Sequence, residues 1–198
     1  MHDGADEHLR AEIARLDALL VRNPKVAAVL ERGPRLDLPS WYLGAGAITQ
    51  TVWNQLHGFE PASGIKDYDL VYFDPTDLSA RTEEARERDA AALFGDLDVR
   101  IDVTNEARVH LWYETRFGVA IAPYRSTEDA ISTWPTTASS VGVRREDGEL
   151  VVCAPFGLHD LFAMIVRPNK TLIDESVYRA KVKRWSRQWP RLTVMPWD

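Results

Sequence analysis

A strand that runs directly into a glycine turn and then into a helix constrains the fold of this chain more than any other feature. Trp41–Leu43 predicts the strand, Gly44–Gly46 forms the turn, and Ile48, Val52 and Leu56 follow at helical spacing. This order of elements packs a helix against the sheet to which the strand belongs. The sequence therefore predicts an α/β or α+β fold, with a small mixed β-sheet flanked by helices.

Apolar residues follow helical or strand periods along the rest of the chain. Leu97, Val99, Ile101 and Val103 alternate with polar residues, which predicts a strand over residues 98–104. Similar reasoning predicts a strand at 70–73, a hairpin of 141–143 with 150–152 around Asp147-Gly148, and helices at 9–20, 26–30, 81–94, 105–118, 126–134, 157–166 and 174–188. The hairpin and the last helices are expected to form a C-terminal lobe.

The length of 198 residues fits one compact domain, or a small core with an appended lobe. We expect N-terminal helices at residues 1–38, a core at 39–120 and the C-terminal lobe at 121–198; the alternative is one compact domain. Hydrophobic residues make up 45% of the chain and charged residues 27%, which excludes disorder as its main character.

Charge is unevenly distributed along the chain. The net charge of −6 argues against a protein that coats nucleic acid through bulk charge. Residues 167–191, however, hold eight Lys and Arg against two Asp and Glu, a net charge of +6. A basic C-terminal segment therefore stands against an acidic remainder.

Three features bear on location. The apolar run Leu161–Val166 is far shorter than the roughly 20 residues that cross a bilayer. The acidic segment Met1–Glu7 lacks the basic and then apolar order of a signal peptide. The single cysteine, Cys153, cannot form an internal disulfide, which favours a reducing compartment and excludes thiolate zinc clusters. We therefore expect a cytoplasmic protein with no membrane partner.

Aspartates on two predicted strands provide the candidate chemistry. Asp67 and Asp69 are two positions apart at the head of a strand, so their side chains point to the same face, about 6.6 Å apart. Asp102 on a neighbouring strand can complete the group. Three carboxylates suit a hard cation such as Mg²⁺ or Mn²⁺, while the N–H groups of a glycine turn at a helix start suit phosphate oxygens. The pattern predicts a metal-dependent phosphate site.

Other interpretations of these residues stay open. Asp98, Arg100 and Asp102 share one strand face, so Asp98 is an alternative third carboxylate, and a solvated face with ion pairs would give the same pattern. Gly44 and Gly46 are also compatible with a tight turn that serves close helix packing.

At these residues the chain resembles the DNA polymerase β-like nucleotidyltransferase superfamily, and within it a bacterial subfamily of unassigned substrate. The superfamily pattern is a glycine turn, an Asp-x-Asp strand and a third carboxylate. The resemblance extends over about residues 40–197 and rests on the strings Leu-Gly-Ala-Gly (43–46), Thr-Val-Trp-Asn (51–54), Lys-Asp-Tyr-Asp-Leu-Val-Tyr-Phe-Asp-Pro (66–75), Ala-Arg-Val-His-Leu-Trp-Tyr-Glu (107–114), Trp-Pro-Thr-Thr-Ala (134–138), Val-Gly-Val-Arg (141–144) and Val-Tyr-Arg-Ala-Lys-Val (177–182).

The resemblance implies a role for each matching residue. Asp67, Asp69 and Asp102 would be the catalytic metal ligands, and Gly44 and Gly46 would hold the nucleotide phosphates. One position departs from the pattern: Thr49 stands where related glycine turns usually have an arginine. Lys66, Arg108 or the basic C-terminal segment would then neutralise the triphosphate in its place.

The implied reaction is metal-dependent transfer of a nucleoside monophosphate from an NTP to a hydroxyl acceptor, with release of pyrophosphate. The acceptor would be a small molecule, an RNA end or a protein. The alternative is a nucleotide-binding or interaction module on the same fold that performs no catalysis.

Overall fold

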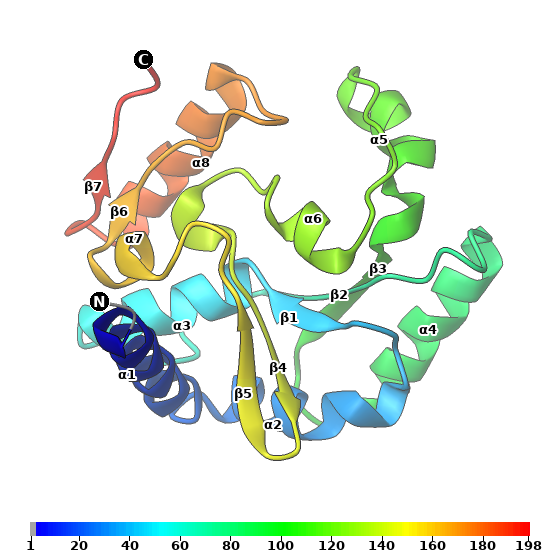
Figure 1. Cartoon of the computed structure of the whole chain (residues 1–198), viewed down its shortest axis with the longest axis horizontal. Coiled ribbons are helices and arrows are strands. Elements are labelled where there is room, and N and C mark those ends of the chain that lie inside the picture. Colours follow the sequence, from blue (N-terminus) through cyan, green and yellow to red (C-terminus); the bar gives the residue numbers. More distant parts are fainter. Residues whose placement is uncertain (1–2) are drawn as a thin grey trace.

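The structure is a computed structural model that describes residues 3–198. Met1 and His2, the start of the acidic N-terminal segment, lie outside the described residues. Five strands form one sheet in the order β3-β2-β1-β4-β5, namely β1 (Tyr42–Gly44), β2 (Asp67–Tyr72), β3 (Arg100–Asn105), β4 (Gly142–Glu146) and β5 (Glu149–Cys153). Strands β2 and β3 are parallel and the other neighbours are antiparallel, so the predicted mixed sheet is confirmed (Figure 1).

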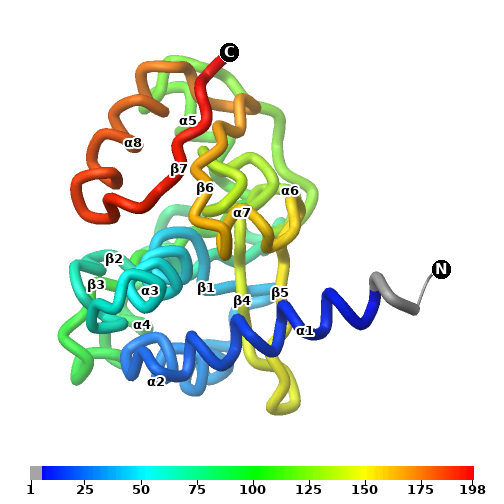
Figure 2. Tube along the Cα trace, turned by 90° about the vertical axis from the view of Figure 1, so that its left-hand side faces the viewer, coloured from blue at the N-terminus to red at the C-terminus, as the bar shows by residue number. Residues whose placement is uncertain are grey.

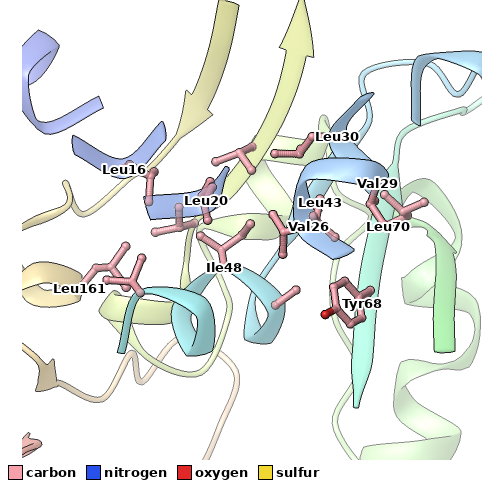
Figure 3. Packing of buried hydrophobic residues seen from close by; sticks show 14 of the residues in the cluster. Leu16, Leu20, Val26, Val29, Leu30, Leu43, Ile48, Tyr68, Leu70 and Leu161 are labelled. Carbon is pink, nitrogen blue, oxygen red and sulfur yellow. The ribbon is translucent and has the colours of Figure 1, made fainter. Parts of the chain in front are cut away.

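Alternating side chains give the sheet two different faces. Leu43 and Leu70 point to one face, where they join a buried cluster with Leu16 and Ile48 (Figure 3). Helices α1 (Asp3–Leu20), α2 (Pro24–Arg32), α3 (Gly46–Leu56) and α4 (Ala80–Leu93) contribute to this cluster, with the 3-10 turn η1 (Gly33–Leu36) and residues of the C-terminal helices. The neighbours of these two leucines along each strand, such as Gly44 on β1 and Asp69 on β2, face the other side of the sheet. That second face carries the candidate site.

The hairpin extends the core sheet. Leu43 of β1 is in register with Val143 of β4, so residues on both sides of the boundary expected at 120/121 share one sheet. The hairpin turn at Asp147 and Gly148 has positive φ angles of 50° and 84°. These angles are those of the type I′ turn for which Asp-Gly is a preferred sequence.

The C-terminal part packs beyond the sheet, and in Figure 2 α5 and α8 lie at the end of the molecule opposite to α1 and α2. Its elements are η2 (Glu106–Arg108), α5 (Val109–Phe117), α6 (Thr127–Ile131), η3 (Thr137–Ser139), α7 (His159–Phe162), β6 (Ile165–Val166), α8 (Glu175–Gln188) and β7 (Thr193–Val194). Strands β6 and β7 form a small parallel pair. Within residues 3–198, no helix combines the length and the apolar character that a membrane crossing requires.

Two predicted elements need correction. The helix expected at 157–166 ends at Phe162, because Met164 adopts a positive φ of 56° and Val166 pairs with Val194 in a strand. The strand expected from residue 98 begins at Arg100, because Asp98 has a φ of 49° and lies outside the ladder.

A cluster of tryptophans fixes α8 to α3. The Trp53 ring lies 5.1 Å from the Trp185 ring and 5.5 Å from the Trp189 ring, both edge-on. All three side chains are buried, and Trp189 Nε1 donates to Asn54 Oδ1 at 2.9 Å. Each edge-on pair contributes about 0.5–1.5 kcal/mol beyond the area it buries. The orientation of α8, and of any side chain it presents to the sheet, is therefore set by the core.

Candidate active site

Adjacent strands place a carboxylate pair beside the glycine turn. In the sheet register, Asp69 on β2 is the partner of Gly44 on β1 and of Asp102 on β3. Asp67 lies two residues before Asp69 and points to the same face. The structure thus brings the three predicted aspartates together at the head of two parallel strands.

Burial and like charge oppose the ionisation of Asp69. Its side chain is half-buried, and burial, with Asp102 and then Asp67 nearby, raises its pKa to about 6. Lys181 and Arg100 act in the opposite direction. Such a group of carboxylates gains stability when a cation binds beside it.

Asp102, and not Asp98, lies beside Asp69. The Asp102 carboxylate accepts from Arg100 Nε at 2.9 Å, and its side chain is 32% exposed. Asp98 lies before the start of β3, where its carbonyl accepts from Lys25 Nζ at 3.0 Å. This placement favours Asp102 over Asp98 as the third carboxylate. The ion pair of Asp102 with Arg100 is of the kind that the other interpretation, a solvated strand face, predicts.

The carboxylates supply the oxygen donors that Mg²⁺ requires, but they do not form a finished cage. Among the described residues, no group of three or more His, Cys, Asp or Glu side chains is arranged to hold a metal ion. Asp102 is turned toward Arg100 instead. The donor set therefore fits a divalent cation in its chemistry and its charge, although Arg100 engages one oxygen of Asp102.

The helix that follows the glycine turn presents its first N–H groups beside these carboxylates. Ala45 lines the adjoining cavity with a φ of 47° and a ψ of −117°, a conformation rarely adopted by a residue with a side chain. The first N–H groups of α3, starting at Gly46, have no partner within the helix. Gly46 is partly exposed and does not line the cavity, and its role toward phosphate stays a prediction.

Gly44 and Thr49 have packing roles. A Cβ on Gly44 would overlap the Trp134 ring, so Gly44 serves close packing, which was the alternative interpretation. Thr49 is fully buried and its hydroxyl lies 3.0 Å from Ala45 O and 3.2 Å from Ala138 O. The position that usually carries arginine thus joins the glycine turn to the segment of η3.

Arg108 was predicted to bind the nucleotide, and its contacts correct that prediction. Its guanidinium pairs with Glu83 of α4, and its Nε donates to Leu78 O at 2.8 Å. The side chain is buried and does not line the cavity, so it joins η2 to α4. Lys66 is exposed, next to Asp67 and outside the cavity lining.

Lys181 is the cation that the sequence analysis missed. It projects from α8 into the cavity that Asp69 also lines. Burial and then the nearby Arg184 lower the pKa of Lys181 to about 8, whereas Asp69 raises it. Three other cations of the basic C-terminal segment are exposed and do not line the cavity: Arg179, Lys183 and Arg187. Only the docking of α8 through Trp185 distinguishes Lys181 from its basic neighbours.

The cavity beside the carboxylates has a volume of about 620 Å³. Strands β2 and β3 form one wall, and α5 and α8 contribute to others (Figure 1). Glu106, at the end of β3, also lines it and is only 5% exposed. Burial, and the charge of Asp69, raise the pKa of Glu106 to about 8. The sequence analysis did not single out Glu106, because its burial depends on α5 and α6.

The geometry agrees with the sequence family. A family model described as nucleotidyltransferase matches residues 31–194, most of the chain. The chain belongs to this nucleotidyltransferase family. The resemblance and the enzyme class predicted from the sequence are confirmed. No curated protein sequence matches the chain significantly.

Solved structures show the same fold. A structure whose description reads that NMR "reveals a CCA-adding enzyme head domain" is 25% identical to this nucleotidyltransferase, with a TM-score of 0.74 over 91% of this chain and 93% of that one. The Thermotoga maritima CCA-adding enzyme in complex with tRNA has 16% identity and a TM-score of 0.56 over 92% and 42%. A tRNA-processing enzyme in an apo form has 15% identity and a TM-score of 0.50 over 84% and 44%. The nucleotidyltransferase thus spans less than half of these two larger enzymes.

Proposed function

We propose that this nucleotidyltransferase transfers a nucleoside monophosphate from an NTP to a hydroxyl acceptor and releases pyrophosphate. The observation that carries the proposal is the register of Asp69 with Gly44 and Asp102, which sets a half-buried carboxylate pair beside the start of α3. A cation bound between the carboxylates and the phosphate would offset the negative charge of both.

Asp67, Asp69 and Asp102 would hold Mg²⁺ or Mn²⁺, which when bound polarises the phosphoryl group and lowers the pKa of the acceptor hydroxyl. The raised pKa of Asp69, at about 6, supports this assignment, because burial and then the neighbouring Asp102 and Asp67 oppose its ionisation more than Lys181 and Arg100 favour it. The ion pair of Asp102 with Arg100 would open when the metal binds.

The chain's own groups would bind and orient the triphosphate. The free N–H groups at the start of α3, at Gly46, and the ammonium group of Lys181 would neutralise phosphate oxygens. Asp102 would accept the proton of the acceptor hydroxyl. The acceptor oxygen forms a bond to the α-phosphorus, the α–β phosphoanhydride bond breaks in line with it, and pyrophosphate leaves.

The acceptor would be an RNA end, a small molecule or a protein. An RNA end gains support from the CCA-adding and tRNA-processing enzymes that share the fold, and from the exposed basic side chains Lys183 and Arg187 on α8. The reducing environment implied by the single Cys153 supports a cytoplasmic enzyme.

The test follows the α-phosphate of labelled NTPs into a panel of acceptors: short RNA with a free 3′ hydroxyl, small polyhydroxy compounds and proteins. Asp69→Asn should lower the rate about 100-fold or more at unchanged far-UV circular dichroism. Lys181→Met should raise the KM for NTP about tenfold, whereas the matched exposed variant Arg179→Met should leave it within about twofold. Full activity of Asp69→Asn would overturn the proposal.

A further inference from the structure

The cavity that holds Asp69 has a second, largely apolar end that phosphate chemistry does not use. Helix α5 lines this end with Trp112, Tyr113 and Phe117. The Tyr113 and Phe117 rings lie 4.6 Å apart and the Trp112 and Phe117 rings 6.4 Å apart, so the three rings form one aromatic wall. Apolar side chains of the segment before α8 and of its first turn, Ile173 and Val177, line the cavity as well.

The aromatic wall is available to a ligand. Phe117 is 54% exposed, and Trp112 and Tyr113 are half-buried. The Arg116 guanidinium lies 5.3 Å from the centre of the Phe117 ring and 5.8 Å from that of Trp112. Exposed aromatic rings with a cation beside them are typical of surfaces on which planar, electron-rich rings stack.

Glu106 adds one polar group to this apolar end. Its side chain is only 5% exposed and has no hydrogen bond or ion pair within the described part of the chain, and its carboxyl oxygens open onto the cavity. A buried carboxyl group without a partner costs stability, and a ligand that donates an N–H to it recovers that cost. A purely aliphatic ligand would leave Glu106 without a partner.

We propose that the aromatic wall of α5 binds a nucleobase, which stacks on Trp112 and Phe117 and donates an N–H group to the Glu106 carboxyl. A nucleobase is flat and aromatic and carries N–H donors at its edge. It therefore matches the aromatic wall, the guanidinium beside it and the Glu106 carboxyl group. The inference rests on the proposed function, because the same cavity holds Asp69. The base belongs either to the NTP or to the end of an RNA acceptor.

The test measures dissociation constants by equilibrium dialysis for three probes: an NTP with Mg²⁺, a short single-stranded RNA with a 3′ hydroxyl, and inorganic tripolyphosphate with Mg²⁺. Trp112→Ala and the surface variant Phe117→Ala should weaken binding of a base-containing probe about tenfold, the usual effect of one lost stacking partner. Binding of tripolyphosphate should change less than twofold. Leu111→Ala is the control, since Leu111 lies exposed on α5 and outside the cavity.

Glu106 is tested by two variants. Glu106→Leu removes the acceptor and should weaken the same probe, whereas Glu106→Gln keeps a carbonyl acceptor and should restore most of the affinity. A loss for the NTP alone assigns the wall to the incoming base, and a loss for RNA alone assigns it to the acceptor. Unchanged affinity for both probes in the α5 variants, or an equal loss in Leu111→Ala, overturns the inference.

The same measurements distinguish failure of the proposed function from failure of the nucleobase inference. If tripolyphosphate and NTP do not bind in the presence of Mg²⁺ while RNA binding still depends on Trp112, the phosphate site is wrong and the aromatic wall stands. If tripolyphosphate binds and no base-containing probe responds to the α5 variants, the phosphate site stands and the aromatic wall is wrong.

Discussion

Glu106 and Asp69 are carboxyl groups whose ionisation is opposed by the fold around them. Both have a raised pKa, about 8 for Glu106 and about 6 for Asp69, and in both burial is the main cause. Perturbed groups of this kind gather at functional sites, where a ligand relieves the cost. At pH 7 Asp69 is therefore ionised, with a charge that a cation would stabilise, whereas Glu106 is mostly protonated and neutral.

The pKa of Glu106 predicts the pH dependence of stability. The ordinary pKa of the group is 4.5, and in the folded protein it is about 8. The folded state thus binds the proton more tightly, so this contribution to stability is complete below pH 4.5 and is lost as the pH rises through 8. Glu106→Gln cannot ionise, and it should exceed the wild type in free energy of unfolding by roughly 3–5 kcal/mol at pH 9.

Urea unfolding at pH 5 and pH 9 measures this difference. Glu114→Gln is the matched control, because Glu114 is exposed on the neighbouring helix α5. A constant gap between Glu106→Gln and the wild type at the two pH values would contradict a buried, ionisable Glu106.

Sequence predicts the aspartates well and the cation poorly, for a physical reason. Strand alternation alone directs Asp67 and Asp69 to one face, and a parallel neighbour brings in Asp102. Lys181, in contrast, is one of six Lys and Arg residues in 179–191. The packing of Trp185 and Trp189 against Trp53 sets the rotation of α8, which places that lysine, and not Lys183, in the cavity with Asp69.

Helix α8 connects the core to the site. Tyr178 and Trp185, both buried, lie on the same face of the helix as Lys181, whose Nζ lies 4.7 Å from the centre of the Trp185 ring. Because Trp185 packs edge-on against Trp53 at 5.1 Å, we expect a change at Trp185 to weaken both the core and the position of Lys181 in the site.

Trp185→Ala should lower the free energy of unfolding by about 3–5 kcal/mol, the usual cost of a large buried aromatic. The variant should also bind Mg²⁺–NTP more weakly, because α8 no longer holds Lys181 over Asp69. Chemical denaturation and equilibrium dialysis check the two effects. Loss of stability with unchanged NTP affinity would show that the position of α8 does not matter to the site.

Elements with local signals are predictable, and those that depend on distant partners are not. The Asp-Gly turn of the hairpin and the capping residue Asp174, whose carboxylate accepts from Val177 N at 3.0 Å, act within a few residues. The helix predicted over 157–166 fails because Val166 pairs with Val194, 28 positions away in the sequence. Local periodicity carries no record of that pairing.

At the scale of the whole molecule, the candidate site forms where distant parts of the chain meet. Strands β2 and β3 supply the carboxylates, α3 supplies its N-terminus, and α5 and α8 flank the cavity above them (Figure 1). The hairpin joins the same sheet, so no boundary near residue 120 divides the sheet. The composition and the strand pattern predict the mixed sheet and its helices, whereas the cavity requires the assembled fold.

Thermal unfolding of the wild type and of Asp67→Asn/Asp69→Asn, each with and without every NTP and Mg²⁺ or Mn²⁺, tests the central claim most directly because it needs no acceptor. A ligand at 100 times its Kd adds about 2.7 kcal/mol, which raises the Tm of a chain of this size by roughly 5–10 °C. The account predicts that this rise requires metal and NTP together and is absent in the double variant. An equal rise in the double variant, or no rise with any NTP, would contradict a nucleotide site on Asp67 and Asp69.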